Sequence, residues 1–485
     1  MRVKWVLIAM TLPATLAGCH TAPVDSPDVG RYPTRATVRR VTSAALPVRP
    51  AEREADDDSD DEVAIVPVDE EITLTAFEDI FEDTDVPPAS PIEGEPAALT
   101  LADLEGLALE HNPSLASAGA RVDAAWGRHV QAGLYPNPVI GYHGTEIGNL
   151  NTAGQQGGFI AQRFITGGKL QLDQAIAGKQ IEQRGFEFNA QQQRVMSDVR
   201  LHFYDALVAQ RRIELTGELA RIGDKLVESS RTLLANQQIS DNDLLQAEIE
   251  AEQAHILRDN AHHQDAESWR RLTVVVGLPE LEPARLAGQL TSDVSHHQWD
   301  DALASLLGRS PELAAAQARV DRARFAIARA RRENVPDIDL SVSIRHINPT
   351  DSDVANVQAG IPIPIFDKNQ GNILEAHSEL VAAQNDVRRI ELDLQDRLAV
   401  AFRRYKNARE QIERYQSRIL ERAQKSLDLV KNGFETGQVE YLTLDTSQRT
   451  FIRVNLAYLD AVKEFWSATT LIDGQLLSGS LSKRD

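Results

Sequence analysis

The part of the chain that carries regular patterns is written twice, with a spacing of about 200 residues. Matching positions recur in the same order: Ala120–Asp123 and the identical Ala318–Asp321, Asn112-Pro113 and Ser310-Pro311, Pro138 and Pro336, Ile239 and Val439, Leu244 and Leu444. Several matches at nearly one offset indicate a structural duplication. Because the offset is so long, each unit is a half built of several elements rather than a short solenoid repeat.

Each half predicts the same succession: a helix, two strands, a very long helix, a tight turn and another long helix. The first helix begins after Thr100 or Asp300-Asp301 and ends before Pro136 or Pro336. The long helix from Lys169 to about Leu233 has ~64 residues and measures roughly 96 Å at 1.5 Å per residue. A rod of that length suits a protein that crosses a wide aqueous space, such as that of a cell envelope.

Apolar residues in the long helices alternate steps of three and four, which predicts coiled-coil seams. The second-half seam comprises Leu380, Ala383, Val387, Ile390, Leu394, Leu398, Ala401, Tyr405, Ala408, Ile412, Tyr415 and Ile419. Its partner comprises Ser447, Phe451, Val454, Tyr458, Ala461, Phe465, Ala468 and Ile472. The corresponding first-half seam, from Ile181 to Ile213, is more polar.

Two second-half segments alternate apolar and polar residues as strands do. In residues 338–345 and 355–365 one face is apolar over about 9–11 residues, enough to cross a bilayer when tilted. Pro362 and Pro364 fit the end of the second strand. Residues 139–148 and 157–165 are weaker first-half candidates. Four strands cannot close a membrane barrel, so these strands predict an oligomer, whether dimer, trimer or tetramer.

The N-terminus predicts export and lipidation. Residues 1–18 form a basic and then apolar leader that ends in small residues before Cys19, the pattern of a bacterial lipoprotein signal; the alternative is an ordinary secretory leader. Residues 19–96 predict an acidic disordered tether, since residues 51–96 hold 18 acidic residues and one basic residue. No apolar run of 18 residues follows Cys19, so a transmembrane helix is not expected. The expected repeats span 97–285 and 286–478, followed by a tail, 479–485.

Five segments of the sequence together are distinctive: Asn112-Pro113, Gln131–Pro138, Val276–Pro279, Ile361–Asn372 and Gly433–Val439. In these segments the chain resembles the TolC-like outer membrane efflux proteins, especially the branch from cobalt–zinc–cadmium resistance systems. The resemblance implies a mainly α fold with a small β part. It further implies a homotrimer with a 12-stranded β-barrel in the outer membrane and a periplasmic α-helical tunnel. The implied partners are a periplasmic adaptor protein, an inner membrane pump and outer membrane lipid.

The turns between the paired long helices are the candidate site, as a periplasmic gate or an adaptor contact. In the family an acidic residue often lies about nine positions after the glycine of the turn; here that position is Thr446, one residue after Asp445. The first turn lacks the usual glycine. The candidate residues are Asp241, Asp243, Gly437, Glu440, Thr443, Asp445 and Thr446. Their carboxylates have two open roles, as solvated helix caps or as a cation-favouring ring in a trimer.

Catalytic, cofactor and metal sites are not expected. The sequence lacks phosphate-binding, zinc-protease and nucleophile-elbow motifs, which argues against an enzyme. The nearby histidines His255, His262, His263, His296 and His297 fit a solvated surface better than a metal site. The expected function is an efflux channel, a passive conduit, with divalent metal cations among its candidate substrates. A channel for drug efflux or type I protein secretion, and an envelope tether without a pore, are the alternatives.

Overall fold

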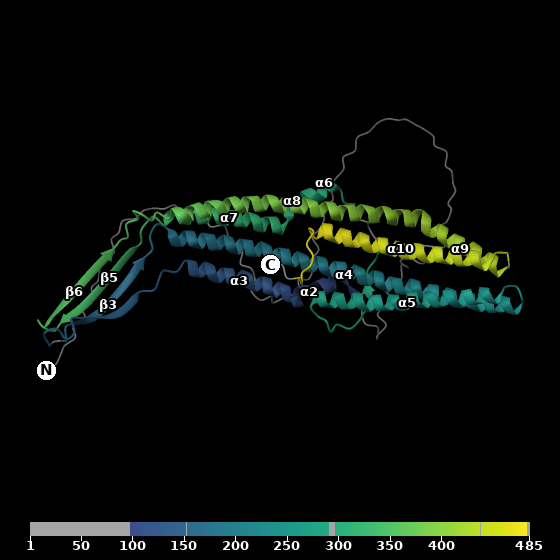
Figure 1. The fold of residues 1–485 in the computed structure, drawn as a ribbon, viewed down its shortest axis with the longest axis horizontal. Coiled ribbons are helices and arrows are strands. Elements are labelled where there is room, and N and C mark those ends of the chain that lie inside the picture. The colour runs from purple at the N-terminus through teal and green to yellow at the C-terminus, as the bar shows by residue number, and fades with distance from the viewer. Residues whose placement is uncertain (1–97, 152, 291–295, 437, 483–485) are drawn as a thin grey trace, which may run out of the picture. The chain divides into compact units, whose positions relative to one another are not determined.

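The computed structural model describes residues 98–482 except 152, 291–295 and 437. The leader, Cys19 and the acidic tether therefore lie outside the described residues. Within the described body, the strands lie at one end of the helices and the two turns between paired long helices lie at the other (Figure 1).

The same order of elements occurs in both halves. The first half contains β1 (Leu99–Thr100), α2 (Leu101–His111), α3 (Pro113–Ala132), β2 (Val139–Thr145), the 3-10 turn η1 (Asn149–Asn151), β3 (Gln155–Phe164), α4 (Lys169–Ala235) and α5 (Asp241–Val276). The second contains β4 (Leu286–Ala287), α6 (Trp299–Arg309), α7 (Pro311–Arg332), β5 (Ile338–Ile347), β6 (Ser352–Gly360), α8 (Gln370–Arg414), the π-helical turn η2 (Tyr415–Ile419), α9 (Leu420–Glu435) and α10 (Tyr441–Asp473).

The prediction of one continuous first helix in each half is wrong, because a proline divides that helix in two. Asn112 ends α2 and caps α3, and its side-chain oxygen accepts a hydrogen bond from the Ser114 N–H at 2.9 Å. Pro113 then occupies the first position of α3, where its missing N–H costs nothing. Ser310 and Pro311 repeat this arrangement between α6 and α7. The duplicated Asn/Ser-Pro pair thus marks a helix junction.

Four strands form one antiparallel sheet in the order β2-β3-β5-β6. The register places Ile140, Ile160, Val342 and Val357 in one row across all four strands. Ile140 and Val357 are 79% and 71% exposed, so this apolar face has no cover within the chain. The adjacent row lies on the other face of the sheet and has smaller and more polar side chains: Val139, Ala161, Ser341 and Gln358.

The predicted alternation of residues 338–345 is confirmed, but β6 ends at Gly360 and not at residue 365. Residues 361–365 are exposed and non-strand, because Pro362 and Pro364 lack the N–H that a ladder needs. The first-half strands are likewise shifted by a few residues from 139–148 and 157–165.

The chain passes from sheet to helix through a buried ion pair. Gly167 and Gly168 adopt left-handed backbone angles, with φ of 68° and 70°, and α4 begins at the next residue. The buried Lys169 Nζ lies 3.0 Å from the Asp337 Oδ1 at the start of the second-half strands. The same carboxylate accepts a hydrogen bond from the Thr166 N–H at 3.0 Å. This junction fixes α4 to the sheet.

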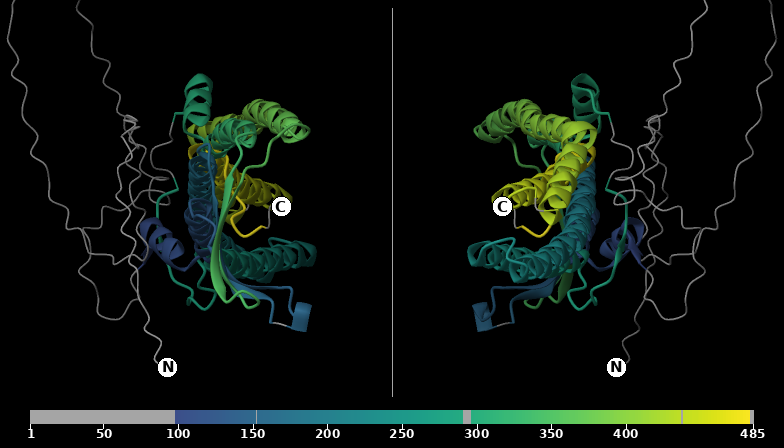
Figure 2. Two further views of the ribbon diagram at one scale, coloured as in Figure 1. Left: turned by 90° about the vertical axis from the view of Figure 1, so that its left-hand side faces the viewer. Right: turned by 90° about the vertical axis from the view of Figure 1, so that its right-hand side faces the viewer.

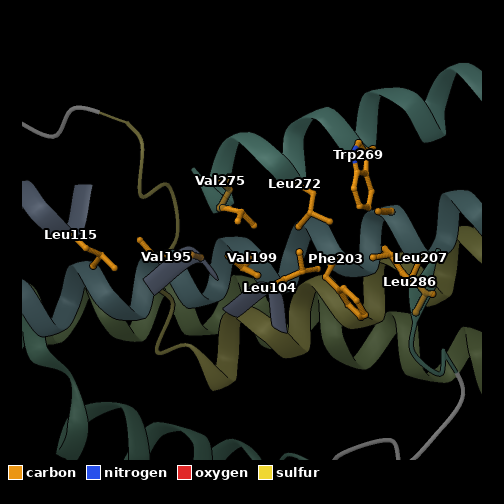
Figure 3. Close-up of a cluster of buried hydrophobic side chains, with 13 residues drawn as sticks. Leu104, Leu115, Val195, Val199, Phe203, Leu207, Trp269, Leu272, Val275 and Leu286 are labelled. Carbon is orange, nitrogen blue, oxygen red and sulfur yellow. The ribbon is translucent and has the colours of Figure 1, made fainter. Parts of the chain in front are cut away.

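The long helix α4 is the centre of the helical packing. It contacts α3 and α5 on one side and α7 and α10 on the other, an arrangement that is visible along the helix axes in Figure 2. At its middle, Val195, Val199 and Phe203 pack against Leu104 of α2 and Leu272 of α5 (Figure 3). The long helix predicted from Lys169 to about Leu233 is therefore confirmed; in the structure it ends at Ala235.

The second-half seam is confirmed as buried from Leu394 to Ile412, is half-buried before Leu394 and at Tyr415, and fails at its last member, Ile419. Leu394, Leu398, Ala401, Tyr405, Ala408 and Ile412 are buried, as the three-four spacing predicts. The π-helical turn η2 adds one residue to a turn, so Ile419 points outward and is 37% exposed. Burial resumes one residue later at Leu420, followed by Ala423 and Leu427.

Candidate functional site

The candidate site is formed by the two turns where the long helices reverse, at the end of the body farthest from the sheet (Figure 1). One turn joins α4 to α5 and the other joins α9 to α10. Both turns pack into one apolar cluster, in which Leu226 and Ala247 of the first pair meet Phe434, Leu444 and Phe451 of the second.

The first turn is held by a capping box. The Ser240 N–H donates to the Asp243 carboxylate at 2.9 Å, and the Asp243 N–H donates to the Ser240 hydroxyl at 3.4 Å. Asp243 is therefore engaged as a helix cap, whereas Asp241 lies exposed in the same first turn. Gln237 takes the left-handed conformation, with φ of 57°, that a glycine would ordinarily supply.

The second turn closes on Gly433. Its carbonyl accepts hydrogen bonds from the Gln438 N–H at 2.8 Å and the Val439 N–H at 3.2 Å. A Cβ on Gly433 would meet the Val439 side chain at 2.6 Å, so the close approach requires glycine. Gly437, which the sequence singled out, lies outside the described residues.

The other candidates on α10 differ in their surroundings. Glu440 is the exposed N-cap residue and its side chain makes no capping bond. Thr443 is exposed, and its N–H donates to the Glu440 carbonyl at 3.1 Å. The Thr446 hydroxyl donates to the Leu442 carbonyl at 2.9 Å. The structure therefore does not bring these three side chains together with Asp445.

Asp445 belongs to a charged cluster that ties the two helix pairs together. The Arg449 Nε donates to the Asp445 carboxylate at 2.9 Å, and an Arg449 Nη bonds Glu250 on α5. The side chains of Asp445 and Glu250 are each only 14% exposed, whereas that of Arg449 is 52% exposed. One guanidinium thus holds two largely buried carboxylates from opposite sides of the tip.

Burial and the neighbouring negative charges shift the pKa values in this cluster. Burial, and then the charge of Asp445, raise the pKa of Glu250, although Arg449 opposes them. Burial first, and then the charges of Asp445 and Glu250, raise the pKa of Tyr441. The Tyr441 hydroxyl is buried and finds no hydrogen-bond partner among the described residues. The site therefore concentrates negative potential at the tip.

Sequence reasoning missed Glu250, Tyr441 and Arg449. The pair Asp445 and Arg449 has the i, i+4 spacing of a helical ion pair, which is a readable signal. The duplication offset of 200 places Glu250 at the level of Thr450, one residue from Arg449. The offset marks equivalent positions in the two halves, but the contact between Arg449 and Glu250 is visible only in the structure.

Two of the candidate histidines are paired with acidic residues. The His255 Nε2 lies 2.9 Å from Asp224, and the His297 Nε2 lies 3.5 Å from Asp473. In the described ranges, no three His, Cys, Asp or Glu side chains gather closely enough to hold a metal ion.

Among the residues that the structure describes, no helix is both long and apolar enough to cross a lipid bilayer.

Comparison with known proteins shows which proteins have a similar sequence and a similar arrangement of sheet and long helices. Residues 302–468 match the family described as "Outer membrane efflux protein". The cobalt-zinc-cadmium resistance protein CzcC of Cupriavidus metallidurans is 26% identical over 389 residues, which cover 77% of this chain and 89% of that protein.

Solved structures share the fold at lower identity. CusC is 18% identical with a TM-score of 0.66, covering 78% of this chain and 92% of that one. The outer membrane protein VceC of Vibrio cholerae is 17% identical with a TM-score of 0.65, covering 78% and 96%. The chain is therefore similar to outer membrane efflux proteins, by the family match over residues 302–468 and by its likeness to CzcC over most of its length.

Proposed function

We propose that this protein is the outer membrane channel of a tripartite efflux system, a passive conduit rather than an enzyme. One observation carries the proposal: a four-stranded sheet with an exposed apolar face continues directly into helices as long as α4. That helix has 67 residues and measures roughly 100 Å. The sheet suits a lipid bilayer, and the helices suit the aqueous space beneath it.

The sheet requires further copies of the chain. Its edges, β2 and β6, have no strand partner in the described part of the chain. Open edges are not tolerated in lipid, and membrane barrels need about eight strands or more. A homotrimer closes a 12-stranded barrel from four strands per protomer, and stacks the helices of three protomers into a tunnel.

The partners follow from the distance between the sheet and the helix turns. With the sheet in the outer membrane, the turns are the part that reaches toward an inner membrane pump and its periplasmic adaptor. We assign the tip residues Asp445 and Glu250, joined by Arg449, as the closing contact of the periplasmic end. Asp241, Glu440, Thr443 and Thr446 are exposed around it and suit an adaptor contact. Gly437, outside the described residues, is retained as a candidate from the sequence alone.

The substrate proposal is a divalent metal cation, supported by the resistance named for CzcC. The test is a deletion strain supplied with the gene on a plasmid. We expect the deletion to lower tolerance to cobalt, zinc and cadmium, and the plasmid to restore it. Unchanged metal tolerance together with lost tolerance to organic drugs, or with lost secretion of a protein, assigns the channel to one of those alternatives instead.

The membrane anchor is proposed separately, from the sequence at Leu16–Cys19. Acylation of Cys19 would add a lipid anchor to the trimer. Labelling with palmitate tests this, because Cys19→Ser removes the acceptor thiol; label retained in the variant would contradict the assignment.

A further inference from the structure

A large cavity lies far from the tips, near the middle of the body. It has a volume of about 880 Å³ and is bounded by α3, α4, α7 and α8. Residues 479–482, which follow α10, contribute Gly479, Ser480 and Ser482 to its lining. The first residues of α3 and α7, at the two helix junctions, also face it.

Arginine dominates the lining. The cavity has five guanidinium groups, from Arg121, Arg184, Arg194, Arg319 and Arg397, and three carboxylates, from Glu187, Glu312 and Asp393. The formal charge of these eight groups is therefore +2. Serine and glutamine side chains supply further hydrogen-bonding groups.

The carboxylates are already occupied by arginines of the same cavity. Glu312 accepts hydrogen bonds from Arg194 at 2.7 Å and from Arg397 at 2.6 Å. Burial alone raises the pKa of Glu312, but hydrogen bonds and charge from these two arginines outweigh it, and the pKa is lowered. Glu312 thus stays ionised near neutral pH, and the excess of positive charge persists.

Glu187 forms a second such group. It accepts hydrogen bonds from Arg184 at 2.6 Å and from Arg319 at 3.3 Å. Arg121 has no carboxylate partner among the described residues and lies exposed at the cavity. Its guanidinium is therefore available to a ligand.

Two buried donors at the cavity lack partners. Both belong to residues of the cavity lining: the Arg194 Nε and the Ser480 hydroxyl are buried and make no hydrogen bond within the described residues. Ser480 is 5% exposed and firmly held: its N–H donates to Asp198 at 2.6 Å, and its carbonyl accepts from Gln191 at 2.9 Å. Leaving such donors unpaired is costly, which favours a ligand that accepts hydrogen bonds.

The cavity lies too far from the sheet for the lipid bilayer to reach it. Glu187 lies 18 residues after Lys169, where α4 leaves the sheet, or roughly 27 Å along the helix. Guanidinium groups match the paired oxygens of phosphates and carboxylates. We propose that this cavity binds a water-soluble, multiply charged oxyanion with phosphate or carboxylate groups.

Calorimetry on the full-length, detergent-purified protein tests the proposal, with pyrophosphate and citrate as probes. We expect at least one probe to bind, with an affinity that falls as salt rises. Arg121→Gln should weaken that binding about tenfold, since a hydrogen bond to a charged group is lost. Arg128→Gln, an exposed arginine on the same helix outside the cavity, should leave it unchanged.

A second variant separates binding from folding. Ser480→Ala keeps the backbone hydrogen bonds to Asp198 and Gln191 but removes the unpaired hydroxyl. We therefore expect this variant to bind the probe more weakly while it still forms the oligomer. Failure of the wild-type protein to bind either probe overturns the proposal. Equal losses in Arg121→Gln and Arg128→Gln overturn it too, because they indicate general charge attraction. Displacement of the probe by lipopolysaccharide but not by free phosphate compounds assigns the cavity to lipid and also contradicts it.

Discussion

At the level of single residues, Arg449 decides how the tip holds together. It is the only cation that the structure places between Glu250 and Asp445 within the described residues, and these two carboxylates otherwise repel each other. The pair belongs to different helix hairpins, so this contact acts across the tip rather than within one helix.

Removing that cation should loosen the tip. We expect Arg449→Gln to destabilise the closed contact by about 1 kcal/mol, because the guanidinium is half exposed and partly screened. Single-channel conductance in planar bilayers should rise. Arg453→Gln, four residues further along α10 and exposed, is the matched control. Equal conductance in both variants would place the closing contact elsewhere.

The same cluster should respond to pH. Because the pKa of Glu250 lies above its ordinary value of 4.5, the closed tip binds this proton more tightly than an opened, solvated one. This stabilisation of the closed tip is complete when the pH is below the ordinary pKa of a glutamate, and it is lost as the pH rises through the raised pKa of Glu250. Conductance should therefore fall on acidification.

Glu250→Gln should remove that pH dependence, measured between about pH 4 and 7. The exposed Glu252→Gln, on the same helix, is the control and should retain it. A slope that survives in Glu250→Gln would assign the titration to other groups.

At the level of elements, the π-helical turn η2 divides a helix that its apolar spacing predicts to be continuous. The helix bends where α8 passes into α9 (Figure 1), and π-helical turns are a known cause of such bends. Gln416 anchors the turn by donating to the Tyr458 hydroxyl of α10 at 3.0 Å. The bend brings Leu427 and Phe434 of α9 onto the apolar cluster of the tip.

Deleting one residue from η2 should straighten the helix. A π-helical turn contains one extra residue, so removal of Ser417 restores regular α-helix. We expect α9 to leave the tip cluster, and hydrogen exchange of residues 420–435 to accelerate. Ser417→Ala keeps the length and is the control. Unchanged exchange after the deletion would show that the bend has another cause.

The two faces of the sheet should differ sharply in their tolerance of charge. Val357 and Gln358 are neighbours on β6 and lie on opposite faces. An arginine facing lipid at the bilayer midplane costs about 2–4 kcal/mol. Val357→Arg should therefore reduce the amount of folded protein in the outer membrane, whereas Gln358→Arg should leave that amount unchanged. Heat-modifiable migration on gels measures the folded fraction. The reverse pattern would invert the assignment of the faces.

At the level of the whole molecule, the sequence predicts the order of the elements and their buried faces better than it predicts contacts between separate helices. The three-four spacing from Leu394 to Ile412 and the duplicated order of elements are visible because apolar periodicity reflects burial directly. The break at Asn112-Pro113 was missed because a capped proline junction leaves the flanking periodicity intact. Ile419 was misplaced because nothing in a regular spacing marks a π-helical turn. Glu250 was missed because an ion pair between hairpins depends on tertiary packing.

The assembly itself is the last prediction. If three sheets close one barrel, β2 of one protomer lies beside β6 of the next, since these are the two edges left open in each sheet. Cysteines introduced together at Tyr142 on β2 and Val357 on β6, combined with Cys19→Ser to remove the native thiol, should be joined between protomers by a short bifunctional reagent. The denatured products should form a ladder that ends at three chains. Cysteines at Gly217 of α4 and Gly308 of α6, which are distant from both edges, should give no ladder. A ladder that ends at two chains, or continues beyond three, would contradict the trimer while leaving the fold of each protomer unaffected.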